Sequence, residues 1–462
     1  MTHSTMNGGA RLGLSRAKRY KTGRELRQLT PREWHAGCPP PSSRDPAAIL
    51  RASDAERIPE LLPKRYKRMK KSPYSFLRGA AAVMAHDLSC LPIAGIPVQA
   101  CGDCHLMNFG VFSTPEGRVL FDINDFDETL PGADFSADLK RLVASVAVAA
   151  LDVNMPPSKA RAIARATAKS YREFILELAA KSPLEIWYTR MDIAREVRRI
   201  GENKLRGKLF STFVKAKKDL AADDNFPHLA KAKTGSPRIE DRPPLIYHFK
   251  SPESREYKIH AHAAFTSYID SLQPERRILM ERYALCDIAF KVVGVGSVGT
   301  FCAIGLFVTP DGEPLFLQVK QALRSVLERL TPPPPGLAHQ GNRVVEGQRA
   351  MQAASDIFLG WTEDPKTNRY FYVRQLKNHR LGSIGEVMAE RELDAYATLC
   401  GRTLARAHAR TGDPAVLAGY MGNSEVLDDA LASFAMAYAA QTKHDHSEFK
   451  AALRAKEGLA AG

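Results

Sequence analysis

The sequence has little of what marks exported or membrane-spanning proteins. It contains 7 cysteines, an odd number without the spacing of a disulfide framework, which favours a reducing compartment over secretion. The N-terminus has basic residues but not the apolar core of a secretory signal. The longest apolar run, residues 143–153, is interrupted by Ser145 and Asp152 and is too short to cross a bilayer. We therefore expect a cytoplasmic protein without a membrane span.

Negative charge is also scarce. The chain has 66 Lys and Arg against 51 Asp and Glu, a net charge of +15, and this surplus favours anionic partners. The basic run at residues 64–71 is either a solvated helix end or a basic wall for phosphate or an acidic partner. Only Tyr66 and Tyr74 lie near it, so nucleic acid is a disfavoured partner, because its binding sites interleave aromatic side chains with the charge. Residues 1–45 are basic and rich in Gly, Ser and Pro, which predicts a largely disordered segment that could recruit an anionic partner.

What the sequence does have is a polar stretch at residues 101–128, CGDCHLMNFGVFSTPEGRVLFDINDFDE. The Pro115-Glu116-Gly117 triplet predicts a turn, and the alternation over residues 119–123 predicts a strand that ends just before Asp125. The unit is therefore expected to run loop, strand, turn, strand, loop, with polar side chains at both loop ends.

This arrangement suits a base beside a substrate hydroxyl and oxygen ligands for a hard cation such as Mg²⁺. We assign Asp103 as the base and Asn108 and Asp125 as the metal ligands, following the logic of phosphoryl transfer. Asp122 is a rival for the metal role, and His105 is expected to orient the loop.

Other interpretations of the same stretch remain open. Cys101, Cys104 and His105 fit the haem-attachment pattern Cys-x-x-Cys-His, and the two cysteines could instead form a zinc or redox pair. The polar residues could also simply cap a turn by bonding to their own backbone. That last explanation accounts for one or two of them but not for the whole set.

A second informative stretch begins at residue 288. The Gly-x-Gly-x-x-Gly pattern at residues 294–299 is followed by β-rich sequence, whereas a dinucleotide fold requires a helix there. The expected order is a strand, a glycine loop, a second strand, a turn at Asp311-Gly312 and a third strand that ends in Lys320. This order predicts a β flap that covers phosphates. Lys320 would hold phosphate oxygens. The residues expected to cover the phosphates are Gly294, Gly296, Ser297 and Gly299.

A glutamate on the next helix should orient Lys320. We assign Glu346, with Glu328 as the alternative, although a solvated helix glutamate explains Glu346 equally well. The glycines could also form no more than a tight turn with a bulge. Lys320 could likewise be a solvent-exposed residue at the end of a strand. Further helices are predicted over residues 138–151, 156–181, 183–200, 262–283, 342–354, 393–410 and 428–453, and residues 201–245 are expected to be a variable insertion.

Gly-Asp-x-His-x-x-Asn, followed by a strand and Asp-Phe-Asp, resembles the catalytic and metal loops of aminoglycoside-phosphotransferase-like kinases. In those kinases the glycine-rich lobe comes first, whereas here it follows. The resemblance therefore implies an α+β, protein-kinase-like two-lobed fold that is circularly permuted, with a predominantly helical large lobe. Permutation is tolerable because termini often lie close together; two unrelated domains are the alternative. The expected segments are 1–45 (disordered), 46–283 (large lobe), 284–378 (small β-rich lobe) and 379–462 (helices completing the large lobe).

Six motifs together are similar to those of the domain of unknown function 2252 family: SPYSFLRG, CGDCHLMNFG, NDFDE, GVGSVG, LQVKQA and ARAHA. The likeness covers roughly residues 55–450 and implies no established reaction. Gln321 departs from it, because an acidic residue is expected after the strand lysine. The residues themselves favour a Mg²⁺-dependent ATP phosphotransferase acting on a small molecule. Nucleotidyl transfer on the same fold, or a nucleotide-binding protein without catalysis, are the alternatives.

Overall fold

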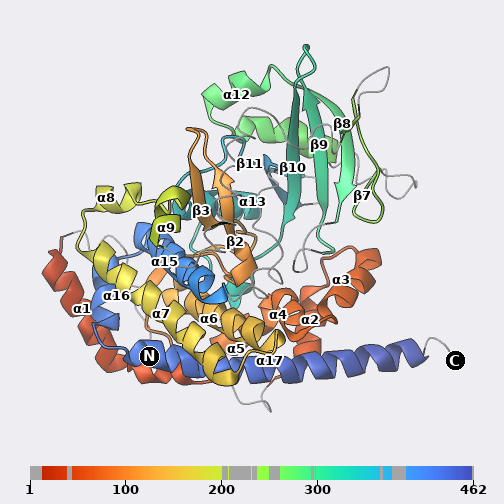
Figure 1. The fold of residues 1–462 in the computed structure, drawn as a ribbon. Helices are drawn as coiled ribbons and strands as arrows, with labels where there is room; N and C mark the ends of the chain where they lie inside the picture. The colour runs from red at the N-terminus through yellow and green to blue at the C-terminus, as the bar shows by residue number, and fades with distance from the viewer. Residues whose placement is uncertain are drawn as a thin grey trace.

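The computed structural model describes residues 13–38, 44–199, 207, 230–231, 237–248, 261–292, 296, 298–364, 368–376 and 392–459. These residues form a mixed helix and sheet structure, which confirms the α+β class. In Figure 1 an antiparallel sheet occupies one part of the molecule and a group of packed helices the other. The β2–β3 hairpin lies between the two parts, and this hairpin carries the polar stretch singled out in the sequence.

Helix α6 (Phe135–Asp152) is the centre of the helical part. Its residues 135–150 are all buried, as expected of a helix surrounded by others, and they include the charged residues Asp138, Lys140 and Arg141. Asp134 caps its N-terminus by accepting a hydrogen bond from the backbone N–H of Ser136. None of the helices in the described ranges is long and apolar enough to cross a membrane. The others in this part are α1 (Arg16–Leu29), α2 (Pro46–Ser53), α3 (Leu62–Met69), α4 (Pro73–Gly79), α5 (Ala81–Ser89), α7 (Pro157–Ala179), α8 (Pro183–Tyr188), α9 (Ile193–Arg199), α15 (Leu393–Thr411), α16 (Pro414–Met421) and α17 (Val426–Leu459).

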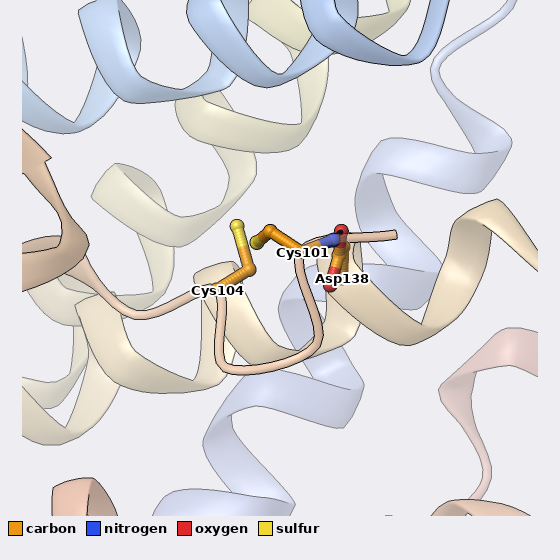
Figure 2. A group of neighbouring side chains, drawn as sticks. All are labelled: Cys101, Cys104 and Asp138. Carbon is orange, nitrogen blue, oxygen red and sulfur yellow. Dashed lines mark hydrogen bonds between the residues drawn. The ribbon is translucent and has the colours of Figure 1, made fainter. Parts of the chain in front are cut away.

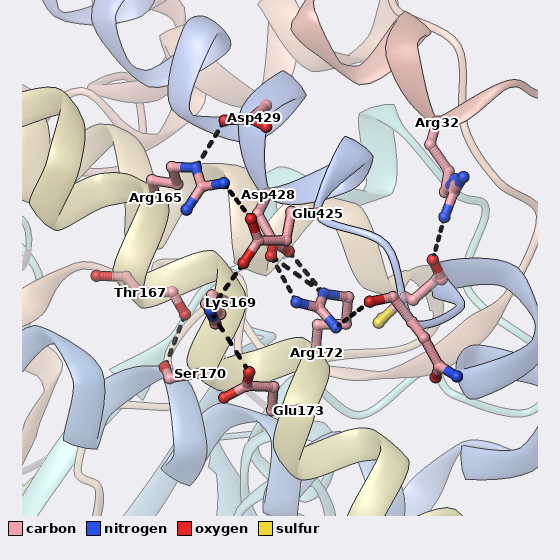
Figure 3. A network of polar contacts seen from close by, with 12 residues as sticks. Arg32, Arg165, Thr167, Lys169, Ser170, Arg172, Glu173, Glu425, Asp428 and Asp429 are labelled. Carbon is pink, nitrogen blue, oxygen red and sulfur yellow. Dashed lines mark hydrogen bonds and ion pairs between the residues drawn. The ribbon is translucent and has the colours of Figure 1, made fainter.

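Charged side chains join α7 to the start of α17 (Figure 3). Arg172 and Asp428 form an ion pair of 2.8 Å with side chains that are 4% and 0% exposed. Arg165 and Lys169 both pair with Glu425, at 2.6 and 2.7 Å. A buried pair fixes the relative position of two helices, because displacing either helix would leave a charge without its partner.

Two short antiparallel pairs carry the loops of the polar stretch. Strands β2 (Phe109–Ser113) and β3 (Val119–Ile123) form a hairpin in which Phe109 lies opposite Ile123, and this confirms the predicted strand–turn–strand unit. Strands β1 (Pro97–Ala100) and β4 (Leu130–Asp134) form the second pair. Each of the two loops therefore begins beside the strand at which the other ends, because β1 pairs with β4 and β3 pairs with β2.

The sheet has six strands in the order β11-β12-β10-β9-β8-β7. Alternate side chains of the central strands enter two separate apolar clusters: Leu317 and Val319 face one, and Phe316 faces the other. The hairpin of β9 and β10 and the glycine-containing connection from β8 to β9 follow the sequence prediction. The bounds are β7 (Ile246–Tyr247), β8 (Ala284–Lys291), β9 (Cys302–Val308), β10 (Pro314–Ala322), β11 (Gly360–Asp364) and β12 (Arg369–Gln375). The described residues also include a two-stranded sheet of β5 (Ala230–Lys231) and β6 (Arg238–Ile239), and helices α12 (Pro274–Met280) and α13 (Gln340–Met351).

The prediction of disorder for residues 1–45 is wrong for residues 16–36, which form α1 and a 3-10 helix at Arg32–Ala36. Helix α1 packs against α16 at very short range. A Cβ added to Gly23 would lie 2.0 Å from the carbonyl oxygen of Val416, and one added to Gly419 would lie 2.0 Å from that of Tyr20. The polar composition of the segment did not predict this contact, because the contact depends on glycines and hydrogen bonds and not on an apolar helix face.

Basic residues of this segment form hydrogen bonds and an ion pair with α16 and its N-cap residue. Arg19 forms an ion pair of 2.8 Å with Asp413, which caps the start of α16. Arg27 donates a 2.7 Å hydrogen bond to the carbonyl of Tyr420, and Arg32 donates to that of Met421. Cations therefore satisfy carbonyl groups at the C-terminal end of α16. Part of the charge proposed to recruit an anionic partner is used within the chain.

The predicted boundary at residue 283 also needs correction. Phe265, Tyr268 and Met280 belong to the apolar cluster on one face of the sheet, so the residues from 261 onward pack with the sheet. The predicted helix over residues 262–283 is interrupted before α12, at Gln273-Pro274, because proline cannot continue a helix. The helix predicted over residues 183–200 is likewise two helices, α8 and α9.

Candidate active site

A cavity of about 390 Å³ lies where the polar stretch meets the glycine-containing connection and β10. Its volume is within the range of small-molecule sites. Segments far apart in the chain contribute to it. Six of the predicted site residues line it: Asp103, His105, Asn108, Asp125, Gly296 and Lys320.

Lys320 and Asp127 form a direct connection between the two stretches, which are 193 positions apart at this point. The Nζ of Lys320 lies 2.5 Å from Oδ2 of Asp127, and the Tyr372 hydroxyl donates to Oδ1 at 2.5 Å. Burial alone would raise the pKa of Asp127, but Lys320 and Tyr372 lower it to about 2. Burial alone would lower the pKa of Lys320, but the Asp127 carboxylate raises it above its usual value. Lys320 is thus a buried cation held at the cavity wall.

Asp103 is held by an arginine of α6. Arg141 donates to Oδ1 of Asp103 from Nε at 3.0 Å and from Nη2 at 2.6 Å. The same Nη2 donates to the carbonyl of Leu77 at 2.8 Å. His105 is buried, and its Nε2 lies 3.6 Å from Oδ2 of Asp103. This contact agrees with an orienting role for His105. One carboxylate oxygen is fixed by Arg141, while Asp103 still borders the cavity.

Asn108 is tied to the same loop. Its Nδ2 donates to the carbonyl of Asp103 at 2.6 Å, so Oδ1 is the atom that it could offer to a metal. Its own carbonyl accepts a hydrogen bond from the backbone N–H of Asn124 at 2.8 Å. This bond holds the loop after β3, which contains Asp125, against the loop after β1. Asn108 and Asp125 both border the cavity and together offer the amide and carboxylate oxygens that Mg²⁺ accepts.

Asp122, the alternative metal ligand, is buried and bonded to other parts of the protein. It is 1% exposed and forms an ion pair with Arg406, which is 0% exposed. Its oxygens also accept backbone hydrogen bonds from Ile123 and Ala353, both at 2.9 Å. Asp122 is not among the residues that line the cavity. The geometry therefore favours Asp125 over Asp122 as a metal ligand.

The glycine-containing connection passes over Asp103. A Cβ added to Gly296 would lie 3.1 Å from the carbonyl of Arg78 and 3.8 Å from Oδ2 of Asp103. Gly299 has a φ of +96°, a conformation that favours glycine, and its carbonyl accepts from the N–H of Ile58 at 2.7 Å. Gly294 and Ser297 lie outside the described residues.

The assignment of Glu346 as the partner of Lys320 is wrong. Glu346 is exposed on α13 and pairs with Arg349 at 3.1 Å, while the alternative, Glu328, pairs with Arg324 at 2.5 Å. The sequence held a signal against Glu346. Val344, Gly347, Gln348 and Met351 are all buried, and their spacing puts Glu346 on the opposite side of the helix.

Helix α13 reaches the site through a residue that the sequence analysis missed. Arg343, which is 1% exposed, donates from Nη2 to the carbonyls of Asp127 and Leu323 at 2.9 and 2.7 Å. Glu128 was also missed. It borders the cavity, accepts from the N–H of Val326 at 2.8 Å, and burial raises its pKa to about 7. No local pattern distinguishes an arginine that binds distant carbonyls from a solvated one.

The turn that contains Asp103 rests on a buried carboxylate of α6. Asp138 accepts hydrogen bonds from the backbone N–H groups of Cys101 at 2.7 Å and Gly102 at 2.9 Å, and Nε2 of His408 lies 3.2 Å from it. Cys101, Cys104 and Asp138 have a spacing compatible with a metal ion, and Figure 2 shows the two sulfurs close together. Both Asp138 oxygens already hold the turn, which supports a structural role for this group.

The family model for an uncharacterized protein conserved in bacteria (DUF2252) matches residues 57–452. The chain belongs to the DUF2252 family. The match includes the cavity-lining residues discussed above. No curated protein and no solved structure matches this DUF2252 chain.

Proposed function

We propose that this DUF2252 protein is a Mg²⁺-dependent ATP phosphotransferase with a kinase-like fold in permuted order. One observation supports this most strongly. Asp103, Asn108 and Asp125 from the early stretch border the same cavity as Gly296 and Lys320 from the late stretch. These are the residue types that phosphoryl transfer requires: a base, two oxygen ligands, a glycine loop and a strand lysine.

The connectivity supports the kinase-like interpretation. A glycine-containing connection joins β8 to β9, the next strand β10 carries Lys320, and α13 follows before β11 and β12. Protein kinases likewise have a glycine-rich loop, a lysine on the third strand and a helix after it. In this chain the loops that carry Asp103 and Asp125 precede that unit, which is the reason for proposing a permutation.

Each residue has a defined part in the proposed reaction. The acceptor hydroxyl attacks the γ-phosphorus of ATP, its proton passes to Asp103, and the bond to the β–γ bridging oxygen breaks to release ADP. Asn108 and Asp125 would hold Mg²⁺, which neutralises phosphate charge. Lys320 would exchange its contact with Asp127 for phosphate oxygens. The rate acceleration would come mainly from positioning and fixed charges.

The proposed location is the reducing cytoplasm. All seven cysteines, from Cys38 to Cys400, are free thiols, and four of them are buried: Cys101, Cys104, Cys302 and Cys400. Burial raises the pKa of Cys104 to about 11, so this thiol is poorly reactive. ATP and Mg²⁺ are both available in that compartment.

Incubating the purified chain with Mg²⁺-ATP and analysing the products tests the proposal. ADP release in the presence of a small-molecule acceptor supports phosphoryl transfer. An adenylylated product would mean nucleotidyl transfer, and binding without any product would mean a nucleotide-binding protein.

The variant Asp103→Asn should retain Mg²⁺-ATP binding but lose ADP release by a factor of about 10² or more, which is typical for loss of a general base. Asp311→Asn is the matched control. Asp311 is exposed at the β9–β10 turn and is absent from the cavity lining. Unchanged ADP release in Asp103→Asn would show that Asp103 is not the base.

A further inference from the structure

We propose that the phosphoryl acceptor carries an oxyanion, a carboxylate or a phosphate, that binds to Arg78 beside Asp103. The proposal rests on the phosphotransferase function above and adds the chemical class of its substrate. Arg78 lies near the end of α4 (Pro73–Gly79) and lines the cavity. It belongs to the Ser-Pro-Tyr-Ser-Phe-Leu-Arg-Gly motif, to which the proposed reaction assigns no role.

The backbone at Arg78 is held next to the proposed base. Arg141 donates through one atom, Nη2, to both the Leu77 carbonyl at 2.8 Å and Oδ1 of Asp103 at 2.6 Å. A Cβ on Gly296 would lie 3.1 Å from the Arg78 carbonyl and 3.8 Å from Oδ2 of Asp103. These contacts put Arg78 on the side of the cavity where the hydroxyl of an acceptor must lie.

Charges around the cavity differ in whether they have partners. Lys320 is paired with Asp127, Arg65 is paired with Asp54 at 3.0 Å, and Arg57 donates to the Val298 carbonyl at 2.8 Å. The Nε atom of Arg78 is buried and has no hydrogen-bond partner among the described residues. The Nε atom of Arg57 also lacks a hydrogen bond, but it lies 3.0 Å from Oδ1 of Asp54 in an ion pair.

A buried guanidinium nitrogen without an acceptor is costly. An oxyanion from the cavity could accept from Nε and from a terminal nitrogen of Arg78 together, in the bidentate geometry that suits carboxylates and phosphates. A cationic group, or a group without an acceptor atom, would leave the nitrogen unsatisfied at this position, and a neutral oxygen would form a weaker hydrogen bond than an oxyanion.

The cationic surroundings favour an anion over a neutral group. Arg68 of α3 is close enough to Arg78 for the two charges to lower the pKa of Arg68, after the larger effect of burial. Two neighbouring guanidinium groups repel each other and are stabilised when an anion binds between or beside them.

The test uses inorganic phosphate and acetate as probes. Each is titrated by calorimetry into the full chain, with and without saturating Mg²⁺ and a non-hydrolysable ATP analogue. The variants are Arg78→Gln, Arg78→Lys and the control Lys67→Gln, which removes the same charge from an exposed position of α3 that does not line the cavity. Thermal unfolding confirms that each variant is folded.

We expect the nucleotide analogue to bind the chain and its Arg78→Gln variant equally well. At least one probe should bind about tenfold or more weakly to Arg78→Gln, the loss typical of a charge-assisted hydrogen bond. Arg78→Lys should recover part of this affinity, and Lys67→Gln should behave like the unmodified chain. The probe that responds identifies phosphate or carboxylate as the acceptor's anionic group.

Two results would overturn the inference: probe binding that is unaffected in Arg78→Gln, or a large loss of nucleotide affinity in that variant, which would assign Arg78 to ATP. Failure of the proposed function has a different signature: the nucleotide analogue does not bind the unmodified chain, or it binds but incubation with Mg²⁺-ATP yields no product.

Discussion

Two single variants, Asp122→Asn and Asp125→Asn, should affect different properties of the protein: the first its stability and the second its affinity for Mg²⁺-ATP. The two carboxylates are three positions apart in the sequence but have different surroundings. Asp122 is buried beneath α15 in an ion pair with Arg406, whereas Asp125 borders the cavity. Asp122→Asn should destabilise the fold, and Asp125→Asn should weaken Mg²⁺-ATP binding while leaving the fold intact.

The size of the first effect follows from burial. Asp122 is 1% and Arg406 0% exposed, and Arg406 also donates to the carbonyl of Met351 at 2.6 Å. An Asn at position 122 keeps one acceptor oxygen but no negative charge, so the guanidinium is left uncompensated in the interior. Breaking such a pair costs about 3–5 kcal/mol of unfolding free energy. Asp125→Asn, at a partly exposed position, should change the unfolding free energy by about 1 kcal/mol or less.

A double variant provides the control for this reasoning. Asp122→Leu combined with Arg406→Met removes both charges and keeps the interior apolar. Its stability should exceed that of Asp122→Asn, because apolar replacement of a buried ion pair is often neutral or stabilising. If the double variant is as unstable as the single one, loss of packing and not the unpaired charge explains the effect.

Urea unfolding followed by circular dichroism measures the stability of each variant, and calorimetry measures its Mg²⁺-ATP affinity. The structural assignment of Asp122 is refuted if Asp122→Asn unfolds within about 1 kcal/mol of the unmodified chain and no longer binds Mg²⁺-ATP. If Asp125→Asn binds Mg²⁺-ATP with unchanged affinity, the metal role of Asp125 is wrong.

Three further predictions concern other parts of the molecule. Lys320→Met should weaken Mg²⁺-ATP binding about tenfold or more, and unchanged affinity by calorimetry would remove Lys320 from the phosphate site. Because burial raises the pKa of Glu128 from 4.5 to about 7, its folded form holds the proton more tightly than the unfolded chain. The unfolding free energy of the unmodified chain should therefore fall relative to that of Glu128→Gln as pH rises from 4.5 to 7. The expected decrease is on the order of 1–3 kcal/mol, because solvent in the cavity beside Glu128 reduces the cost of its charge. Parallel pH profiles of urea unfolding for the two proteins would contradict this. Gly23→Val should displace α1 from α16, seen as faster tryptic cleavage near residue 20, while Gly13→Val, at a position with open space around it, should not.

Local patterns in the sequence were enough to predict the elements of the site. The alternation around residues 119–123 gave the β3 strand, and the turn residues at 115–117 gave the hairpin. The glycine run followed by β-rich sequence excluded a dinucleotide fold and predicted the β8–β9–β10 unit ending at Lys320. These predictions held because strand alternation and turn chemistry depend on neighbouring residues.

Pairing across the molecule could not be predicted in this way. Four acids lie within residues 122–128, one in β3 and three after it. Only the tertiary structure shows that Asp122 pairs with Arg406 and Asp127 with Lys320. The wrong assignment of Glu346 has the same origin. A kinase-like expectation supplied a glutamate on the helix after the strand, but the buried face of α13 presents Arg343 to the site.

The sequence by itself determined the class of the fold, the loops that carry the polar residues and the chemical types available for the proposed phosphate site. The tertiary structure decided which of those residues share a cavity, which charge pairs with which, and that residues 16–36 fold onto α16. The physical reason is the range of the interactions. Hydrophobic period and turn propensity act within a few residues, whereas ion pairs and close glycine contacts join segments whose separation along the chain carries no local signal.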